Sequence, residues 1–239
     1  MDDAVVAELV EFTGLTREDV EARVSEGVYR TARVFREWPG EPEQWYRETD
    51  AYLFELADNA FGEFYQAIAD RLVAGLGERT GPLHVLEYGC GIGCFALTLA
   101  DSGFAVTACD LNDWNTRFLQ FRIRRRGHRD VVRIVSPEES LSRKEGYHII
   151  SCQHVLEHVP DPLGMLRRFH DCLIPSGVFF GAAPFDLVGP DFPEHVPENA
   201  HLRLEDLCAE AGFQVLSTSP YATFDQSTFT LVIAAKPVA

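Results

Sequence analysis

One stretch decides the fold of this chain: Val85-Leu86-Glu87-Tyr88-Gly89-Cys90-Gly91-Ile92-Gly93. An apolar strand runs here into a turn with three glycines, and glycine accepts the backbone conformations that a tight turn beside a ligand requires. A second apolar run, Val106 to Cys109, ends in Asp110. In a parallel sheet this acid lies at the carboxyl end of the next strand, where it can accept hydrogen bonds from a ribose diol. The pattern predicts a nucleoside site at the first switch point of an α/β sheet.

The spacing of the glycines indicates which nucleoside. A dinucleotide fingerprint, G-x-G-x-x-G, needs its third glycine at position 94, which is Cys94; the observed order is E-x-G-x-G-x-G. A pyrophosphate requires an open helix amino terminus, whereas an amino-acid tail requires a carboxylate for its ammonium. Glu87 could supply that charge directly or through water. The spacing therefore argues against a nicotinamide-dependent oxidoreductase, which is the rival class of enzyme.

The run from Val85 to Gly93 resembles motif I of class I S-adenosylmethionine-dependent methyltransferases, with Asp110 as the acid after the second strand. Three further segments resemble the small-molecule branch of that family, of the type 11 and ubiquinone-biosynthesis kind. They are the run His148 to Pro162 after strand four, Leu173 to Phe180 leading into strand five, and the pair His201-Leu202-Arg203 and Ala211-Gly212-Phe213 around the closing helix. The resemblance covers about residues 80 to 239.

The resemblance implies S-adenosylmethionine as cofactor, with S-adenosylhomocysteine as product, and it implies roles for particular residues. Glu87 would anchor the methionine ammonium, and Asp110 the ribose hydroxyls. Leu111 would cover the adenine, Gln153 would contribute at the tip of strand four, and the methionine would lie along the backbone of Gly89, Cys90, Gly91 and Gly93. Where relatives have an acid after strand three, this chain has Val135 to Glu139, so Ser136, Glu138 or the backbone would make that contact.

The fold class expected is α/β: a Rossmann-like, seven-stranded, mainly parallel sheet with an antiparallel last strand and helices on both faces. Strands are predicted at 83–88, 104–109, 131–135, 147–152, 177–183, 213–219 and 228–235, and helices at 92–101, 113–125, 162–172 and 203–211. The irregular, proline-rich stretch from Pro184 to Pro197 follows strand five at the edge where ligands bind in such sheets. It is a candidate substrate wall.

Residues 1–78 are predicted to be a helical extension, and residues 79–239 the methyltransferase domain. Thr16 is a candidate helix cap, and Pro39 to Pro42 is a break. From 43 to 76 apolar and aromatic residues recur at helical spacing, with a bend expected near 59–62. Two interpretations of these aromatic side chains stay open: they pack the helices onto the sheet, or they form a lid over the substrate.

His154, Glu157 and His158 form H-x-x-E-H, an order also found in one class of zinc proteases. The protease interpretation fails because the segment follows a strand and ends at Pro160. The segment also resembles the E-x-x-E-H motif of ubiquinone-type O-methyltransferases, which have a divalent cation near the substrate. Because His154 replaces their first glutamate, Glu157 and His158 are interpreted as framework residues and no metal is predicted. His154 is the candidate general base, with His195, His201, Asp191 and Glu194 as further candidates.

Charge limits the partners of the 239-residue chain. Its 37 acidic against 21 basic residues give a net charge of −16, so nucleic acid is not an expected substrate. Arginines 122, 124, 125, 126 and 129 are interpreted as a solvated helix end. No segment predicts a membrane span or a signal peptide, and six cysteines without a C-x-x-C pair fit a reduced, cytoplasmic protein.

These features, with the resemblance, predict an enzyme that moves a methyl group from S-adenosylmethionine to an oxygen or nitrogen, or else a carbon, of a small metabolite, with secondary metabolism as a candidate pathway. The alternative is a domain that keeps the cofactor but serves a non-methylating reaction or a protein partner. The sequence carries no prediction of oligomeric state.

Overall fold

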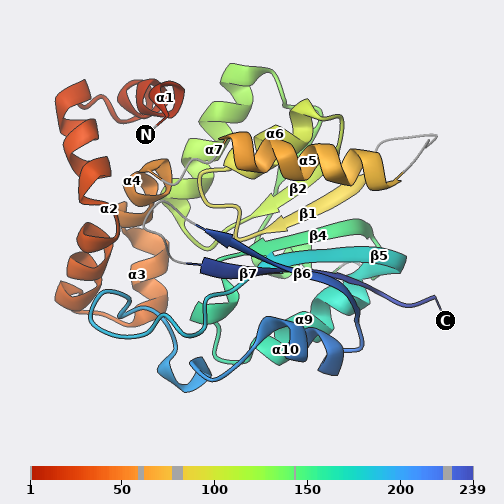
Figure 1. Ribbon diagram of the computed structural model, residues 1–239. Helices are drawn as coiled ribbons and strands as arrows, with labels where there is room; N and C mark the ends of the chain where they lie inside the picture. The colour runs from red at the N-terminus through yellow and green to blue at the C-terminus, as the bar shows by residue number, and fades with distance from the viewer. Residues whose placement is uncertain (1, 59–61, 77–82, 143, 223–227, 239) are drawn as a thin grey trace.

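The computed structural model describes residues 2–58, 62–76, 83–142, 144–222 and 228–238. They form a seven-stranded sheet in the order β3-β2-β1-β4-β5-β7-β6 (Figure 1). The strands are β1 (His84–Tyr88), β2 (Ala105–Cys109), β3 (Val132–Ile134), β4 (Tyr147–Gln153), β5 (Leu173–Ala182), β6 (Gln214–Ala222) and β7 (Thr228–Ala235). The first five strands pair in parallel, and β7 runs antiparallel to both β5 and β6. The predicted fold class and the antiparallel last strand are confirmed.

Helices cover both faces of the sheet, and a further group of helices lies beside it (Figure 1). The first group is α1 (Asp3–Thr13), α2 (Arg17–Glu37), α3 (Pro42–Glu48) and α4 (Ala51–Asp58). On one face lie α5 (Gly62–Leu76), α6 (Cys94–Asp101) and α7 (Asp113–Arg126), and on the other α9 (Pro162–Cys172) and α10 (Leu204–Glu210). Short turns of helix form α8 (Pro137–Ser140), η1 (Leu156–His158) and η2 (Pro197–Asn199).

The central strands bury both of their faces, as a covered parallel sheet requires. Successive side chains of a strand point to opposite faces. Val85 accordingly belongs to the core under α5 and α6, and its neighbour Leu86 to the core under α9. Ile149 and Ile150 divide in the same way. This explains why the strands are continuous apolar runs in the sequence.

The predicted boundary of strand five was wrong. The prediction began at residue 177, but β5 begins at Leu173, which pairs with Tyr147 of β4. The register then shifts, and Ser176 takes a positive φ of 64°. The backbone N–H of Ser176, within this irregular segment, donates to the carbonyl of Lys236 just after β7. The turn that the sequence indicated is therefore a bulge within one strand. The short helix α8 was not predicted.

The segment from 43 to 76 contains more breaks than the single bend expected. Thr49 ends α3 with an extended ψ of 151°, and α4 begins two residues later. The residues between α4 and α5, 59–61, lie outside the described ranges, as does the proposed domain boundary at residue 78. The predicted cap at Thr16 is confirmed, because its side chain accepts from the backbone N–H of Asp19.

Part of the amino-terminal segment is core. Leu9 of α1 and Leu53 and Phe54 of α4 are buried with Ile92 of the glycine turn and Phe118 of α7. In α5, the ring of Tyr65 stacks on Phe95 of α6, with centroids 5.2 Å apart. These helices thus supply hydrophobic contacts to the sheet and to its glycine turn.

The turn between β1 and α6 has the backbone that its glycines predict. Gly89, Gly91 and Gly93 have φ values of 74°, 51° and 76°, in the left-handed region that other residues adopt at a cost. Space is restricted as well: a Cβ on Gly89 would lie 2.1 Å from Cγ2 of Val155. Conformation and close approach both require glycine here.

We expect Gly89→Ala to lower the free energy of unfolding by about 2–5 kcal/mol, from backbone strain and the clash together. Gly103→Ala is the matched control, because Gly103 has a similar φ of 86° but nothing within 4 Å of a built Cβ. It should cost only the strain, about 1–2 kcal/mol. Urea unfolding of the two variants measures the difference. Equal losses would show that the approach of Val155 does not restrict the turn.

Candidate functional site

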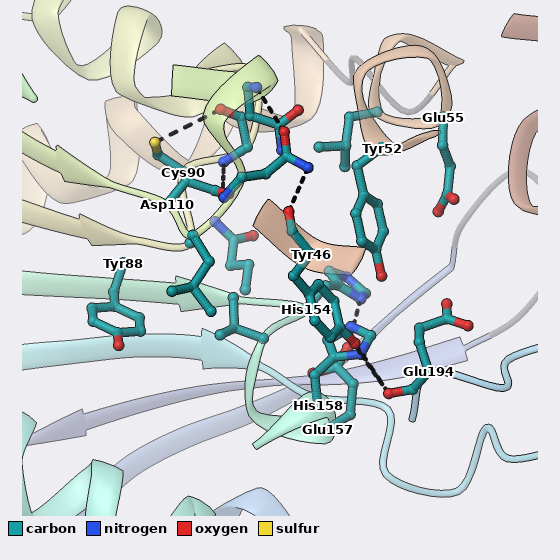
Figure 2. Close-up of a pocket in the computed structure, with 18 of the residues that line it drawn as sticks. Tyr46, Tyr52, Glu55, Tyr88, Cys90, Asp110, His154, Glu157, His158 and Glu194 are labelled. Atoms are coloured by element: carbon teal, nitrogen blue, oxygen red, sulfur yellow. Dashed lines mark hydrogen bonds and ion pairs between the residues drawn. The ribbon is translucent and has the colours of Figure 1, made fainter. Parts of the chain in front are cut away.

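A cavity of about 790 Å³ opens at the carboxyl ends of β1, β2 and β4 (Figure 2). Its floor is the glycine turn with Asp110 and Leu111. Its walls come from α3 and α4, from the end of β4 through η1, and from the loop after β5, which lies beside α3 in Figure 1. The irregular stretch after strand five does line the cavity, through Pro184, Leu187, Phe192, Glu194 and His195.

Asp110 and the glycine turn meet as the motif predicts. The Asp110 carboxylate accepts hydrogen bonds from the backbone N–H groups of Gly91 (2.7 Å) and Asn112 (2.8 Å). Burial raises the pKa of this carboxyl, and the two backbone bonds oppose the rise. The carboxylate therefore fixes the turn while it lines the cavity.

Glu87 presents an unsatisfied carboxylate to the same cavity. The residue is only 6% exposed, and its Oε2 has no hydrogen-bond partner within the described chain. Burial raises the pKa of Glu87 well above its usual range, and the charge of Asp110 raises it further. A buried carboxylate in this state is stabilised by a cation. The observation fits the ammonium of a methionine tail.

Cys90, Leu111 and Gln153, the remaining predicted cofactor residues besides the glycines, also line the cavity. The Gln153 amide donates to the Ser151 hydroxyl (3.2 Å). In the segment after strand three, Pro137 is the residue that reaches the cavity wall. Ser136 instead caps α8, accepting from the backbone N–H of Glu139.

The H-x-x-E-H segment folds back on itself at the end of β4. His154 takes a positive φ of 55°, and its Nδ1 lies 3.6 Å from Oε1 of Glu157. Glu157 is 1% exposed, and within the described structure its Oε2 has no partner. Although burial opposes ionisation, the hydrogen bond from His154 and the nearby His158 hold the pKa of Glu157 below its usual range.

The loop after β5 brings His195 to His158, with the two rings 4.7 Å apart. Burial lowers the pKa of His158, and burial together with His158 lowers the pKa of His195 to about 4. Both imidazoles are therefore neutral. Tyr46 joins them from α3: its hydroxyl lies 2.9 Å from Nδ1 of His158 and donates to the carbonyl of Glu194 (3.1 Å).

Glu157, His158 and His195 form a group that could hold a metal, because each offers a ligand atom within 4.8 Å of the others. His154, at the first position of the motif, is not one of its members. The absence of a metal stays a prediction. Of the other candidate bases, Glu194 and His195 line the cavity, whereas Asp191 and His201 are exposed and outside its wall.

Two contributors to the site carried no functional signal in the sequence. Glu55 of α4 lines the cavity, beside Tyr52 of the aromatic pattern, and the Asn112 side chain donates to the backbone carbonyls of Tyr46 (2.6 Å) and Thr49 (2.9 Å). Asn112 had only the signal of a helix cap, a role it also plays by accepting from Asn115. An acid on an amphipathic helix gave no reason to place Glu55 inside.

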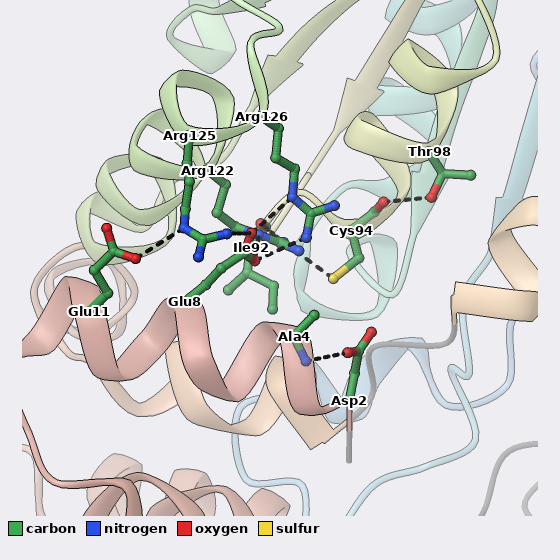
Figure 3. Close-up of polar contacts among 10 residues, drawn as sticks. All are labelled: Asp2, Ala4, Glu8, Glu11, Ile92, Cys94, Thr98, Arg122, Arg125 and Arg126. Carbon is green, nitrogen blue, oxygen red and sulfur yellow. Dashed lines mark hydrogen bonds and ion pairs between the residues drawn. The ribbon is translucent and has the colours of Figure 1, made fainter.

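The arginine cluster at the end of α7 was wrongly interpreted as a solvated helix end. Arg122 is 2% exposed and donates to the buried carboxylate of Glu8 of α1 (2.8 Å), which Arg126 also contacts (Figure 3). The other end of the Arg122 guanidinium donates to the carbonyl of Ile92 in the glycine turn (2.6 Å). An ion pair thus links α1 to the turn. Arg124 and Arg129 are exposed, as expected.

The fold is Rossmann-like, with a cavity at the carboxyl ends of its parallel strands. Residues 61–218 match the methyltransferase domain family. The chain belongs to that family.

Curated relatives include two ubiquinone biosynthesis O-methyltransferases. The one from Nitrosomonas europaea is 32% identical over 114 residues, 46% of this chain and 46% of the relative. The one from Nitrosospira multiformis is 34% identical over 99 residues, 40% of this chain and 41% of the relative. The chain thus spans less than half the length of these relatives.

Solved structures show the same fold at low identity. The CurJ carbon methyltransferase matches with a TM-score of 0.66 and 13% identity, over 97% of this chain and 70% of that one. The 1,6-didemethyltoxoflavin-N1-methyltransferase of Burkholderia thailandensis gives 0.57 and 21%, over 76% and 80%. The [4+2]-cyclase SpnF gives 0.58 and 16%, over 81% and 87%.

In the ranges that the structure describes, no helix combines the length and apolar character that crossing a bilayer requires. The six cysteines are all free thiols, and five of them are buried.

We expect Glu8→Gln to lower the free energy of unfolding by about 3–5 kcal/mol, because it leaves the buried Arg122 guanidinium without a counter-charge. Glu11→Gln is the control: Glu11 pairs with Arg125 at the exposed edge of the same helix contact. It should cost about 0.5 kcal/mol or less. Urea unfolding followed by circular dichroism compares them. A Glu8→Gln loss no larger than that of the control would contradict a stabilising role for the buried pair.

Proposed function

We propose that this protein transfers the methyl group of S-adenosylmethionine to an oxygen or nitrogen of a small molecule that binds in the cavity. The observation that carries the proposal is the buried, unsatisfied carboxylate of Glu87 beside the glycine turn and Asp110. A cavity of about 790 Å³ is in the range of small-molecule sites, about 300–1,000 Å³.

In this proposal the chain positions two reactants and little more. The cofactor supplies an activated methyl group on a sulfonium. Glu87 pairs with the methionine ammonium, Asp110 binds the ribose hydroxyls, and Leu111 covers the adenine. The backbone of Gly89, Cys90, Gly91 and Gly93 follows the methionine, and Gln153 borders it. Fixed geometry of this kind lowers the barrier of an in-line displacement.

The amino-terminal helices serve as the wall and the lid of the acceptor site. Tyr46 and Tyr52 line the cavity, and Leu56 lies close enough to Gly91 that a Cβ there would be 2.7 Å from its Cδ1. The division into an extension, residues 1–78, and a methyltransferase domain, residues 79–239, is proposed on the same ground. Excluding water from the reacting atoms is the benefit of such a cover.

His154 is the proposed general base. Its backbone is fixed by the bond from its N–H to the carbonyl of Ala182 (2.8 Å), and Glu157 orients its ring. Glu194 and His195, across the cavity, are the alternatives. An imidazole held by a carboxylate is suited to accept the proton of an acceptor hydroxyl or amine.

A second candidate is a protein that binds the cofactor without transferring its methyl group. This candidate is retained because the chain has a fold similar to that of the [4+2]-cyclase SpnF. Release of S-adenosylhomocysteine with an acceptor present separates the two. We also propose that the binding partner is a small molecule, that the protein binds neither nucleic acid nor a membrane, and that it is located in the cytoplasm.

Asp110→Asn should weaken S-adenosylhomocysteine binding by about 1–3 kcal/mol, because the amide cannot accept all of the hydrogen bonds that the carboxylate accepts. Isothermal titration calorimetry measures the loss, with Asp113→Asn, an exposed acid of the next helix turn, as control. Affinity that is unchanged in a folded Asp110→Asn protein would overturn the assignment of the ribose site.

His154→Gln should lower kcat by about 100-fold or more, the contribution of a general base. His154 is not among the residues proposed to bind the cofactor. The affinity for S-adenosylhomocysteine should therefore stay within about twofold of wild type. Initial rates with a methyl acceptor, beside calorimetry, test this. A variant with normal kcat would transfer the assignment to Glu194 or His195.

A further inference from the structure

The acceptor end of the cavity is acidic. Three glutamates line it from three segments: Glu55 from α4, Glu157 from η1 and Glu194 from the loop after β5. Glu87 and Asp110 lie at the cofactor end. None of the described residues that line the cavity is a lysine or an arginine. The basic side chains that line it are His154, His158 and His195.

The three glutamates each leave an oxygen unsatisfied. The Oε2 atoms of Glu55, Glu157 and Glu194 are buried and find no hydrogen-bond partner in the described ranges, and neither does Nδ1 of His195. Glu157 is 1% exposed and Glu194 is 8% exposed. Leaving such a group unpaired in a buried site is unfavourable, and more so when it is charged. Three in one cavity indicate a ligand that supplies the missing partners.

The sign of that ligand follows from the groups that line this end of the cavity. The unsatisfied oxygens of Glu55, Glu157 and Glu194 can only accept hydrogen bonds when the carboxyl groups are ionised, so a ligand must donate to them. No lysine or arginine among the described lining residues would attract an anion. A cationic donor supplies both the missing hydrogen bonds and the opposite charge.

The surroundings suit an organic cation. Figure 2 shows the hydroxyl of Tyr52 directed toward the side of the cavity where the carboxylates of Glu55 and Glu194 lie. The rings of Tyr46 and Tyr52 are nearly parallel, with centroids 6.0 Å apart, and line the wall next to these acids. Aromatic faces beside carboxylates are the usual complement of an ammonium group.

We propose that the acceptor is a small molecule with a protonated amine, and that Glu55, Glu157 and Glu194 bind this amine. The inference rests on the proposed function, since it names the acceptor of that same site. A metal ion on Glu157, His158 and His195 is the competing occupant, and it would reverse the preference by attracting an anionic acceptor.

Three probes with one ring test the charge preference: tyramine, 4-ethylphenol and 4-hydroxyphenylacetate, which carry a positive, no and a negative charge. Each is titrated by calorimetry into the full chain saturated with S-adenosylhomocysteine, in EDTA. We expect tyramine to bind about tenfold or more tightly than 4-hydroxyphenylacetate, the effect of one charge-assisted hydrogen bond. Saturation with S-adenosylhomocysteine is recorded first, so failure of the cofactor site is distinguished from failure of this inference.

Variants locate the effect. Glu194→Gln and Glu55→Gln should each reduce the preference for tyramine severalfold, because each removes a carboxylate proposed to bind the amine. Glu43→Gln, at the exposed rim and paired with Arg47, should leave the preference unchanged.

Several results would overturn the proposal. Equal affinity for the three probes, no binding of tyramine at millimolar concentration, or tighter binding of 4-hydroxyphenylacetate would each do so. Tighter anion binding only after addition of Mg²⁺ or Zn²⁺ would assign the site to a metal. Should a variant fail to fold, the charge series measured on the wild type decides the question.

Discussion

The structure depends on how the backbone turn after β1 is held. The carboxylate of Asp110 accepts from Gly91 on one side of the turn, and the guanidinium of Arg122 donates to Ile92 on the other. Glycines at 89, 91 and 93 make the conformation accessible, but these two charged groups fix it. Since both bonds are charge-assisted, they are stronger than neutral ones. The cofactor end of the cavity, the docking of α1 and the position of α7 all follow from this arrangement.

The distribution of charge is the second constraint. A net charge of −16 would ordinarily describe a solvated surface, yet this chain buries several of its acids. Glu8 is balanced by arginines, with which its burial is compatible. Glu87, Glu157 and Glu194 keep oxygens without partners in the described chain. An unpaired buried charge is unfavourable. We therefore distinguish Glu8, which stabilises the fold through its ion pairs, from the acids with unpaired oxygens, which are proposed to bind ligands.

The amino-terminal helices have two roles because α4 has two faces. Leu53 and Phe54 face the core that includes Ile92 and Phe118, whereas Tyr52, Glu55 and Leu56 face the cavity. Residues three and four apart share a helix face, so the short helix can do both. The alternative interpretations drawn from the aromatic pattern, core or lid, are therefore compatible, and the helices are part of one folded unit with the glycine turn.

The sequence by itself determined the sheet, the glycine turn and the placement of Gly91 beside Asp110. Strand periodicity and turn chemistry depend on residues close together in the chain, so they can be recognised without the tertiary structure. Tertiary structure alone decided the partners of Arg122 and Glu55, and the approach of His195 to His158. Arg122 meets Glu8 across more than one hundred residues, and no periodicity encodes such a distance. Whether an acid on a helix faces water or a cavity depends on which elements pack against it, and packing is decided only by the whole chain.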